Sequence, residues 1–218
     1  MTDYAAARLN MVESQLRTNT VTDPAVLDAF LAVPRERFVP PAVQRTAYVD
    51  ERLPLGGRRW LMEPMVLARL IQLAAIGEDD IVLDVGCGSG YAAAVLARLA
   101  RQVVAIDSEP LLVAQAVARL RELGAGNVLA VEAPMAEGYP ARAPYDAILI
   151  EGGVTQLPEA MSRQLAEGGR LVTLMGEGNG VGHAVIMSKS GGVLSRRPVF
   201  DAASPLLPGF ERAPSFQF

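Results

Sequence analysis

The feature that most restricts the fold is a glycine-rich turn near the middle of the 218-residue chain. The apolar run 81–85 leads into Gly86, Gly88 and Gly90, and a helical pattern begins at Tyr91. Glycine suits a turn in which the backbone reverses sharply and approaches a ligand without an intervening Cβ atom. The start of the next helix offers free backbone N–H groups. We therefore predict a strand, a ligand-binding turn and a helix, the opening unit of an α/β nucleotide-binding fold.

The chain after Pro64 alternates between helical and strand patterns, which predicts a mostly parallel central sheet. Ser190-Gly191-Gly192 separates two further strand patterns, 183–189 and 193–200, and indicates an antiparallel hairpin at the sheet edge. The fold class is therefore α/β and Rossmann-like. We predict strands at 81–85, 102–106, 128–131, 145–150 and 170–175, and helices at 64–75, 91–99, 109–123 and 157–165.

The first part of the chain differs from this core. An amphipathic helix is expected over 3–18, and a second begins at Pro24, capped by Thr22 or Asp23, and ends at Val33-Pro34. Residues 38–54 are expected to be irregular, and 204–218 to form an ordered segment that crosses the domain. We predict one domain over 1–218, with a helical and loop extension at 1–63 and the Rossmann-like core at 64–218.

Two acidic residues indicate the ligand of the glycine turn. Asp84 lies two positions before the first glycine, where a carboxylate would repel a pyrophosphate but attract the ammonium group of a methionine moiety. Asp107 ends the next strand, where an acid accepts hydrogen bonds from both ribose hydroxyls. This combination favours S-adenosylmethionine over a dinucleotide, although the glycine turn alone suits either ligand. Each acid also has a structural alternative: Asp84 can cap the loop or helix, and Asp107 can be a turn residue at the end of its strand.

Composition excludes several classes of function. The net charge of −4 argues against a nucleic-acid partner, which usually needs a basic face. No apolar run is long enough for a membrane span, and no secretory signal precedes the first helix. A lone cysteine, Cys87, fits a cytoplasmic location. Together with the distant His183 it makes no metal site, and His183 is expected on an exposed strand rather than in catalysis.

The chain resembles the protein-L-isoaspartate O-methyltransferase family over nearly its whole length. The resemblance rests on sequence words that follow the family order and is most specific in the first part of the chain. These words are Met11–Arg17, Asp23–Leu27, Val33–Pro40, Ala47–Asp50, Leu53–Gly56, Leu123–Val128 and Ala143–Ile148. The resemblance implies the class I methyltransferase fold and methylation of the carboxylate of isoaspartyl residues in damaged proteins, which serves protein repair. The sequence does not give the oligomeric state, and we favour a monomer.

The predicted cofactor contacts combine the glycine turn, the ends of the neighbouring strands and the adenine side of the cleft. In the family a Gly-Asp-Gly motif serves the adenine side, and here it aligns with Ala133-Pro134-Met135, so the neighbouring Glu132 is the acid that can replace it. The expected cofactor-binding residues are Asp84, Gly86, Cys87, Gly88, Gly90, Asp107, Ser108, Glu132 and Ala133.

The residues expected on the substrate side depart from the family pattern. The family reads Gly-His-Gly-Gln-Thr-Ile-Ser-Gln-Pro where this chain reads 56–64, so its substrate-side serine aligns with Met62, its threonine with Trp60 and its second glutamine with Glu63. The family's Val-Thr-Ala-Ala motif after the fourth strand aligns with Ile-Glu-Gly-Gly at 150–153 of this chain, which places a carboxylate, Glu151, in the motif. The substrate-side candidates are Arg58, Trp60, Met62, Glu63 and Glu151.

Each departure also has a structural alternative. In that alternative, the charged residues Arg58, Arg59 and Glu63 belong to a solvated loop, and the side chains of Trp60 and Met62 fill the core. If they line the pocket, either arginine can pair with the substrate or with the new acids. Three functions remain open: isoaspartyl repair, methyl transfer to a different acceptor such as a small carboxylate, and cofactor binding without transfer.

Overall fold

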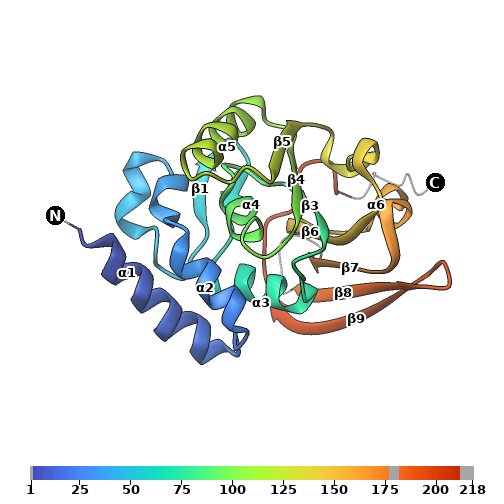
Figure 1. Ribbon diagram of the computed structural model, residues 1–218, viewed down its shortest axis with the longest axis horizontal. Coiled ribbons are helices and arrows are strands. Elements are labelled where there is room, and N and C mark those ends of the chain that lie inside the picture. The colour runs from blue at the N-terminus through green and yellow to red at the C-terminus, as the bar shows by residue number, and fades with distance from the viewer. Residues whose placement is uncertain (1, 177–181, 212–218) are drawn as a thin grey trace, which may run out of the picture.

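The computed structural model describes residues 2–176 and 182–211. Its centre is a seven-stranded sheet in the order β5-β4-β3-β6-β7-β8-β9 (Figure 1). The first five of these strands are parallel neighbours, and β8 and β9 are antiparallel. The strands are β3 (Ile81–Val85), β4 (Gln102–Asp107), β5 (Val128–Glu132), β6 (Tyr145–Val154), β7 (Leu165–Met175), β8 (Gly182–Ser190) and β9 (Val193–Ala202).

Helices cover both faces of the sheet, as its buried apolar strands require. On one face, α3 (Pro64–Ala74) packs against β6 and β7, while α4 (Tyr91–Leu96) and α5 (Pro110–Glu122) pack against β4 and its neighbours. On the other face, α6 (Glu159–Gln164) packs against β7. Two buried apolar clusters result, one on each side of the sheet.

The N-terminal extension packs on the first of these faces. Helix α1 (Tyr4–Met11) continues into a π-helical turn at Val12–Leu16, and α2 (Pro24–Ala32) follows. Asp23 caps α2 by accepting hydrogen bonds from the amides of Ala25 and Val26, which confirms one of the two expected caps. Arg35 is completely buried and donates to the carbonyl oxygens of Ala47 and Met62, both at 2.7 Å.

The parallel strands, the C-terminal hairpin and the long helices confirm the predicted class and element order. The expected helix at 157–165 is shorter, because β7 begins already at Leu165, and β6 continues past the expected end to Val154. The sequence did not predict the small antiparallel hairpin of β1 (Leu53–Gly56) and β2 (Arg59–Leu61). Residues 53–54 were expected to be irregular because Pro54 is unusual in a strand, but this strand lies at an edge.

Residues 204–211, called the strap below, cross the end of β6. Gly153 donates to the carbonyl oxygen of Pro205 at 2.9 Å and accepts from the amide of Leu207 at 2.9 Å. Leu207 and Phe210 are buried in the apolar cluster on the α6 side. The expected ordered segment is thus present up to Glu211, and the remainder of that prediction, 212–218, lies outside the described residues.

Candidate cofactor and substrate site

The candidate site lies where the direction of the sheet order reverses. Strand β3 has β4 on one side and β6 on the other. The chain therefore adds β4 and β5 on one side of β3, and then β6 and β7 on the opposite side. In open α/β sheets a ligand crevice forms at the carboxyl ends of the strands at such a point. The glycine turn, 86–90, follows β3 at this position and leads into α4.

The glycine turn needs glycine at Gly86 and Gly88 because both have a left-handed backbone, with φ of +82° and +52°. A Cβ atom on Gly86 would lie 3.0 Å from Nη2 of Arg59 and 3.2 Å from a methyl group of Leu207. One on Gly88 would lie 2.7 Å from a methyl group of Leu55. Three segments distant in sequence, β1, β2 and the strap, therefore converge on this turn.

Asp107, the expected ribose acid, is fully buried at the end of β4. Its Oδ2 accepts hydrogen bonds from Nη2 of Arg59 at 2.6 Å, Nε of Arg59 at 3.2 Å and the amide of Gly88 at 2.8 Å. Its Oδ1 accepts from the amide of Glu109 at 3.1 Å. The expected ribose contact is thus engaged by a side chain of the protein itself.

Arg59 is buried, with 2% of its side chain exposed, and also donates to the carbonyl oxygen of Gly86 at 2.6 Å. The solvated-loop interpretation is therefore wrong for Arg59. It failed because β2 turns this side chain inward against Asp107, and the neighbouring Arg58 remains outside with 74% of its side chain exposed. The acid that Arg59 contacts is Asp107 rather than either new glutamate.

Two further carboxyl groups lie beside Asp107, and both lack donors. Asp84 is fully buried in β3 and Glu151 is nearly so in β6. No donor group in the described part of the chain reaches either Asp84 oxygen or Oε1 of Glu151. Burial raises the pKa of Asp84 to about 7 and holds the pKa of Glu151 well above its usual range. An acceptor-rich pocket of this kind suits a cationic ligand group.

The substrate-side candidates surround a small recess beside these acids. Glu151, Glu63 and the strap form part of its wall. Trp60 is 38% exposed and stacks with Arg52, whose guanidinium carbon lies 5.6 Å from the ring centre. Arg58 pairs with Glu211 of the strap at 3.1 Å. Burial raises the pKa of Glu63, which precedes α3.

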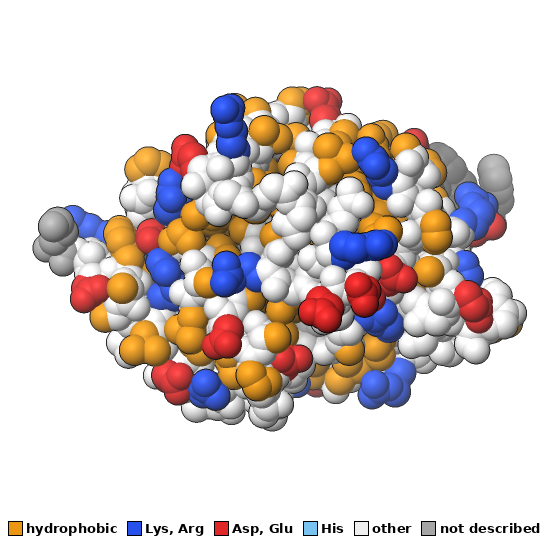
Figure 2. Space-filling view, in the orientation of Figure 1, with side chains coloured by type: hydrophobic (Ala, Val, Ile, Leu, Met, Phe, Trp, Pro, Cys, Tyr) orange, Lys and Arg blue, Asp and Glu red, His pale blue; other side chains and the backbone are white. Residues whose placement is uncertain are grey.

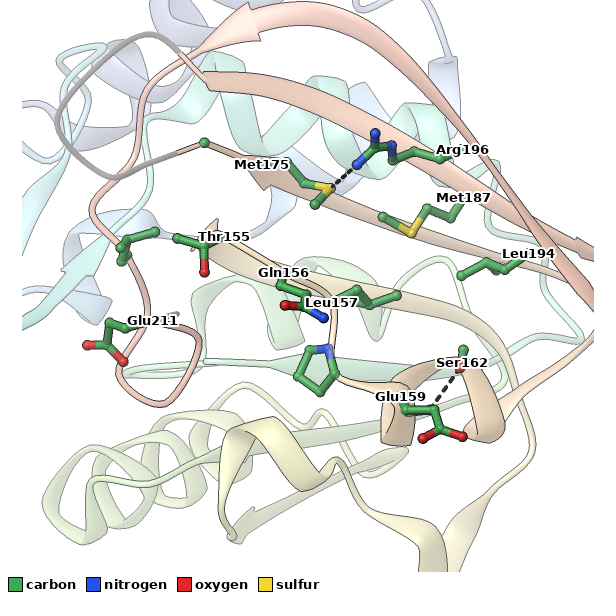
Figure 3. Close-up of a pocket in the computed structure, with 13 residues that line it drawn as sticks. Thr155, Gln156, Leu157, Glu159, Ser162, Met175, Met187, Leu194, Arg196 and Glu211 are labelled. Carbon is green, nitrogen blue, oxygen red and sulfur yellow. Dashed lines mark hydrogen bonds between the residues drawn. The ribbon is translucent and has the colours of Figure 1, made fainter. Parts of the chain in front are cut away.

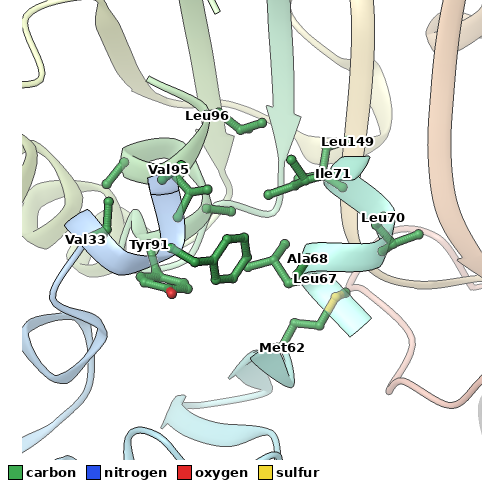
Figure 4. Close-up of a cluster of buried hydrophobic side chains, with 14 of the residues drawn as sticks. Val33, Met62, Leu67, Ala68, Leu70, Ile71, Tyr91, Val95, Leu96 and Leu149 are labelled. Carbon is green, nitrogen blue, oxygen red and sulfur yellow. The ribbon is translucent and has the colours of Figure 1, made fainter. Parts of the chain in front are cut away.

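Met62 is 3% exposed and packs within the apolar cluster beside α3, near Leu67 and Leu70 (Figure 4). Its side chain contributes the inner wall of the recess, where the family pattern has a hydroxyl group. The core-filling interpretation thus describes Met62 better than it describes Trp60, which stays partly exposed.

The expected adenine side lies at the ends of β4 and β5. Asp107 pairs in register with Glu132, and the amide of Ala133 donates to the carbonyl oxygen of Asp107 at 3.1 Å. Ser108 and Glu132 are exposed there. Pro134 has no N–H group to offer a ligand, so the donors on this side come from the backbone around it.

Cys87 and His183 lie apart from any reactive arrangement. Cys87 is buried inside the glycine turn, and burial raises the pKa of its thiol well above the usual range, so the thiol fills space. His183 is exposed on β8, where Nδ1 lies 2.7 Å from Oδ1 of Asp201. Both positions agree with the expectations from the sequence.

A large hollow of about 1160 Å³ lies away from the glycine turn. It separates the end of β6 and α6 from the β8–β9 hairpin, and Leu157, Met187, Leu194 and Arg196 line it (Figure 3). Arg196 contacts the sulfur of Met175 at 3.6 Å across the hollow. Neither Asp84, Asp107 nor Glu151 reaches this hollow, so size alone does not identify the site.

The surface charges agree with the composition. On the face seen in Figure 2, basic and acidic side chains are interspersed. The net charge of the chain is −4. Among the described helices, none has the length and apolar character to cross a membrane.

Sequence reasoning missed three contributors to the site. Arg52 and Leu207 had no motif to mark them, because their roles arise from stacking on Trp60 and from the path of the strap. The burial of Arg59 had one available signal. In the word Arg58-Arg59-Trp60-Leu61, alternation along a short strand places Arg59 and Leu61 on one face and Arg58 and Trp60 on the other.

Comparisons with known proteins agree with this architecture. The family model for protein-L-isoaspartate (D-aspartate) O-methyltransferase matches residues 7–200. A protein-L-isoaspartate O-methyltransferase from Methanoregula boonei is 40% identical over 184 residues, which cover 84% of each chain. A solved protein-L-isoaspartate O-methyltransferase has a TM-score of 0.82 at 25% identity, covering 94% of this chain and 67% of the other.

A second solved structure, from Plasmodium falciparum and in complex with S-adenosyl-L-homocysteine, has a TM-score of 0.76 at 18% identity. It covers 94% of this chain and 98% of the other, and this likeness shows the shared fold. The family match and the Methanoregula relative both extend over most of the sequence. The chain therefore belongs to the protein-L-isoaspartate (D-aspartate) O-methyltransferase family.

Proposed function

We propose that this protein transfers a methyl group from S-adenosylmethionine to the free α-carboxylate of isoaspartyl residues in damaged proteins. The observation that carries the proposal is the family match over residues 7–200, which includes the glycine turn and its acids. A methyl ester formed there cyclises to a succinimide, and the succinimide reopens in part to normal aspartate. The protein thereby serves protein repair.

The residues present fit S-adenosylmethionine chemically. Asp107 offers carboxylate oxygens at the end of β4, where ribose hydroxyls are bound in this fold. Gly86 and Gly88 let a ligand approach the backbone. Asp84 provides two buried oxygens that no donor in the described residues satisfies, which suits an ammonium group. The Plasmodium structure that shares this fold contains S-adenosyl-L-homocysteine.

Binding requires two side chains of the protein to move. Arg59 holds the ribose acid, and Leu207 lies against Gly86. The Arg59 guanidinium occupies Oδ2 of Asp107, so ribose hydroxyls bound to this carboxylate would compete with Arg59 for it. We expect Arg59 to turn toward the recess when Asp107 accepts the ribose.

The chemistry asks the protein mainly to align two reactants. When bound, the cofactor supplies an electrophilic methyl group on a sulfonium centre. The chain must place a carboxylate oxygen in line with that methyl group and exclude water. Arg52 and Arg58, on the outer side of the recess, are the cations available to attract a substrate carboxylate. They leave one carboxylate oxygen free to attack if each makes a single contact.

The proposal is tested by calorimetric titration with S-adenosylmethionine and S-adenosylhomocysteine, followed by methyl transfer to an isoaspartyl peptide. A peptide of the same sequence with normal aspartate is the control. Binding with transfer to the isoaspartyl peptide alone is the expected result. Binding without transfer would replace the proposed acceptor by another carboxylate or leave cofactor binding as the function. Absence of binding would refute the proposal.

A further inference from the structure

The carboxyl groups of Asp84, Asp107 and Glu151 gather on one face of the sheet at the ends of three adjacent strands. Asp84 in β3 lies beside Ala105 in β4 and beside Leu149 in β6. Asp107 and Glu151 come two residues after these partners, and side chains two apart on a strand share a face. The three acids therefore point to the same side, toward β2 and α3, rather than being divided between faces.

Among the described residues, Arg59 is the cation that pairs with this group, and it pairs with Asp107. Arg59 is bound to Asp107, which also accepts two backbone amides. Asp84 and Glu151 are left with three oxygens that receive no hydrogen bond from any donor in the described residues. Buried acceptors without donors are rare in folded proteins and call for an explanation in terms of a proton, a water or a ligand.

A shared proton satisfies the pair when the site is empty. Burial raises the pKa of both carboxyl groups, and the nearby charge of Asp84 raises the pKa of Glu151 further. The other groups that act on the pair are the Asp107 carboxylate, which favours the proton, and the Arg59 guanidinium, which opposes it.

We propose that Glu151 is a cofactor-binding residue, and that Asp84 and Glu151 together receive the α-ammonium group of S-adenosylmethionine. The inference rests on the proposed function. An ammonium group has three donors and no acceptor, which matches two carboxylates that lack donors. The ammonium replaces the shared proton, which leaves to solvent, so both carboxyl groups become ionised on binding. Glu151 thereby moves from the expected substrate side of the site to its cofactor side.

The position of Glu151 supports this assignment. It is 6% exposed and lies in the strand next to that of Asp84, whereas Arg58 and Trp60 on the outer side of the recess are partly or largely exposed. The next residue, Gly152, lies beneath Leu207, and a Cβ atom there would approach that side chain to 2.5 Å. The strap therefore packs closely on this section of β6 and narrows the recess that Glu151 lines.

The test is calorimetry of the full chain with S-adenosylhomocysteine at pH 6.5 in buffers of different ionisation enthalpy. The dependence of the observed heat on the buffer gives the number of protons released. We expect about one proton released per cofactor. Below the pKa of the pair, the dissociation constant should rise about tenfold for each pH unit by which the pH is lowered. Glu151→Gln should remove the proton release and weaken binding at least tenfold at pH 8.

Two controls separate this role from a general effect of nearby acids. Glu63→Gln removes another carboxyl group of the recess whose pKa is raised by burial, and it should leave proton release unchanged. 5′-Methylthioadenosine keeps the nucleoside and the thioether but has no ammonium group. It should bind wild type and Glu151→Gln equally well, and without proton release.

The outcomes distinguish this inference from the proposed function. Binding of S-adenosylhomocysteine without proton release, or with equal affinity for Glu151→Gln, would overturn the role of Glu151 and leave the methyltransferase assignment intact. Equal weakening of 5′-methylthioadenosine binding by Glu151→Gln would also overturn it, because the effect would not depend on the ammonium group. Failure of wild type to bind S-adenosylhomocysteine would refute both.

Discussion

Removal of Arg59 should make the protein less stable and a better cofactor binder. The guanidinium of Arg59 forms two contacts with Asp107 and one with the carbonyl oxygen of Gly86, with both charged side chains buried. Loss of one member of a buried pair costs about 3–5 kcal/mol of unfolding free energy. Asp107 keeps its hydrogen bonds from Gly88 and Glu109, so we expect Arg59→Ala to lose about 3 kcal/mol.

The gain in affinity follows from the same contacts. In wild type, ribose binding must break the charge-assisted hydrogen bonds between Arg59 and Asp107, each of which contributes about 1.5–3 kcal/mol. The variant has no such bond to break, and about 1.4 kcal/mol is a factor of ten. We therefore expect Arg59→Ala to bind S-adenosylhomocysteine roughly 10–100-fold more tightly in calorimetry.

Two matched variants decide how this result is interpreted. Asp107→Ala removes the other half of the ion pair, so its stability loss in urea unfolding should be similar, but cofactor binding should disappear. Arg58→Ala removes the adjacent exposed arginine and should change neither stability nor affinity measurably. Thermal midpoints of both buried-pair variants should fall by roughly 6–12 °C. Unchanged or weaker binding by Arg59→Ala would refute competition between Arg59 and ribose.

Three further predictions concern the same region. Because burial raises the pKa of both Asp84 and Glu151, the folded empty protein holds more protons than the unfolded chain between about pH 4 and 7, and its stability should fall as the pH rises through that range. Glu151→Gln should flatten this profile in urea unfolding, and an unaltered profile would contradict the shared proton. Met62→Ser should lower stability by about 2–4 kcal/mol, since a buried apolar side chain is truncated, and a neutral effect in the same assay would place Met62 outside the core. Leu207→Ala should open the contact over Gly86 and speed S-adenosylhomocysteine association in stopped-flow fluorescence, whereas an unchanged rate would show that the strap does not limit entry.

The sequence predicted most of the fold because its signals were local. Apolar runs that end in glycine or acid marked the parallel strands, and Asp23 before Pro24 marked the start of a helix. The β1–β2 hairpin was missed because Pro54 obscured a two-residue alternation in a very short strand. Such short elements are specified by what packs on them more than by their own sequence.

The candidate site was only partly predictable. The positions of Asp84, Gly86 and Asp107 followed from strand ends, which are visible in sequence. The partner of Asp107 was not, because the contact between Arg59 and Asp107 joins residues 48 positions apart. The proximity of Asp84 to Glu151 likewise depends on β6 lying next to β3, which is a property of the sheet order.

The burial of Arg35 links the N-terminal extension to the rest of the chain in a way that affects how the protein unfolds. Its guanidinium lies 4.9 Å from the ring centre of Tyr91 in α4 and is bound to the backbone at Ala47 and Met62. Separation of residues 1–63 from the core would break the contact between Arg35 and Tyr91 and leave the aromatic ring without cover. The extension and the Rossmann-like core should therefore melt in a single calorimetric transition, as one cooperative unit.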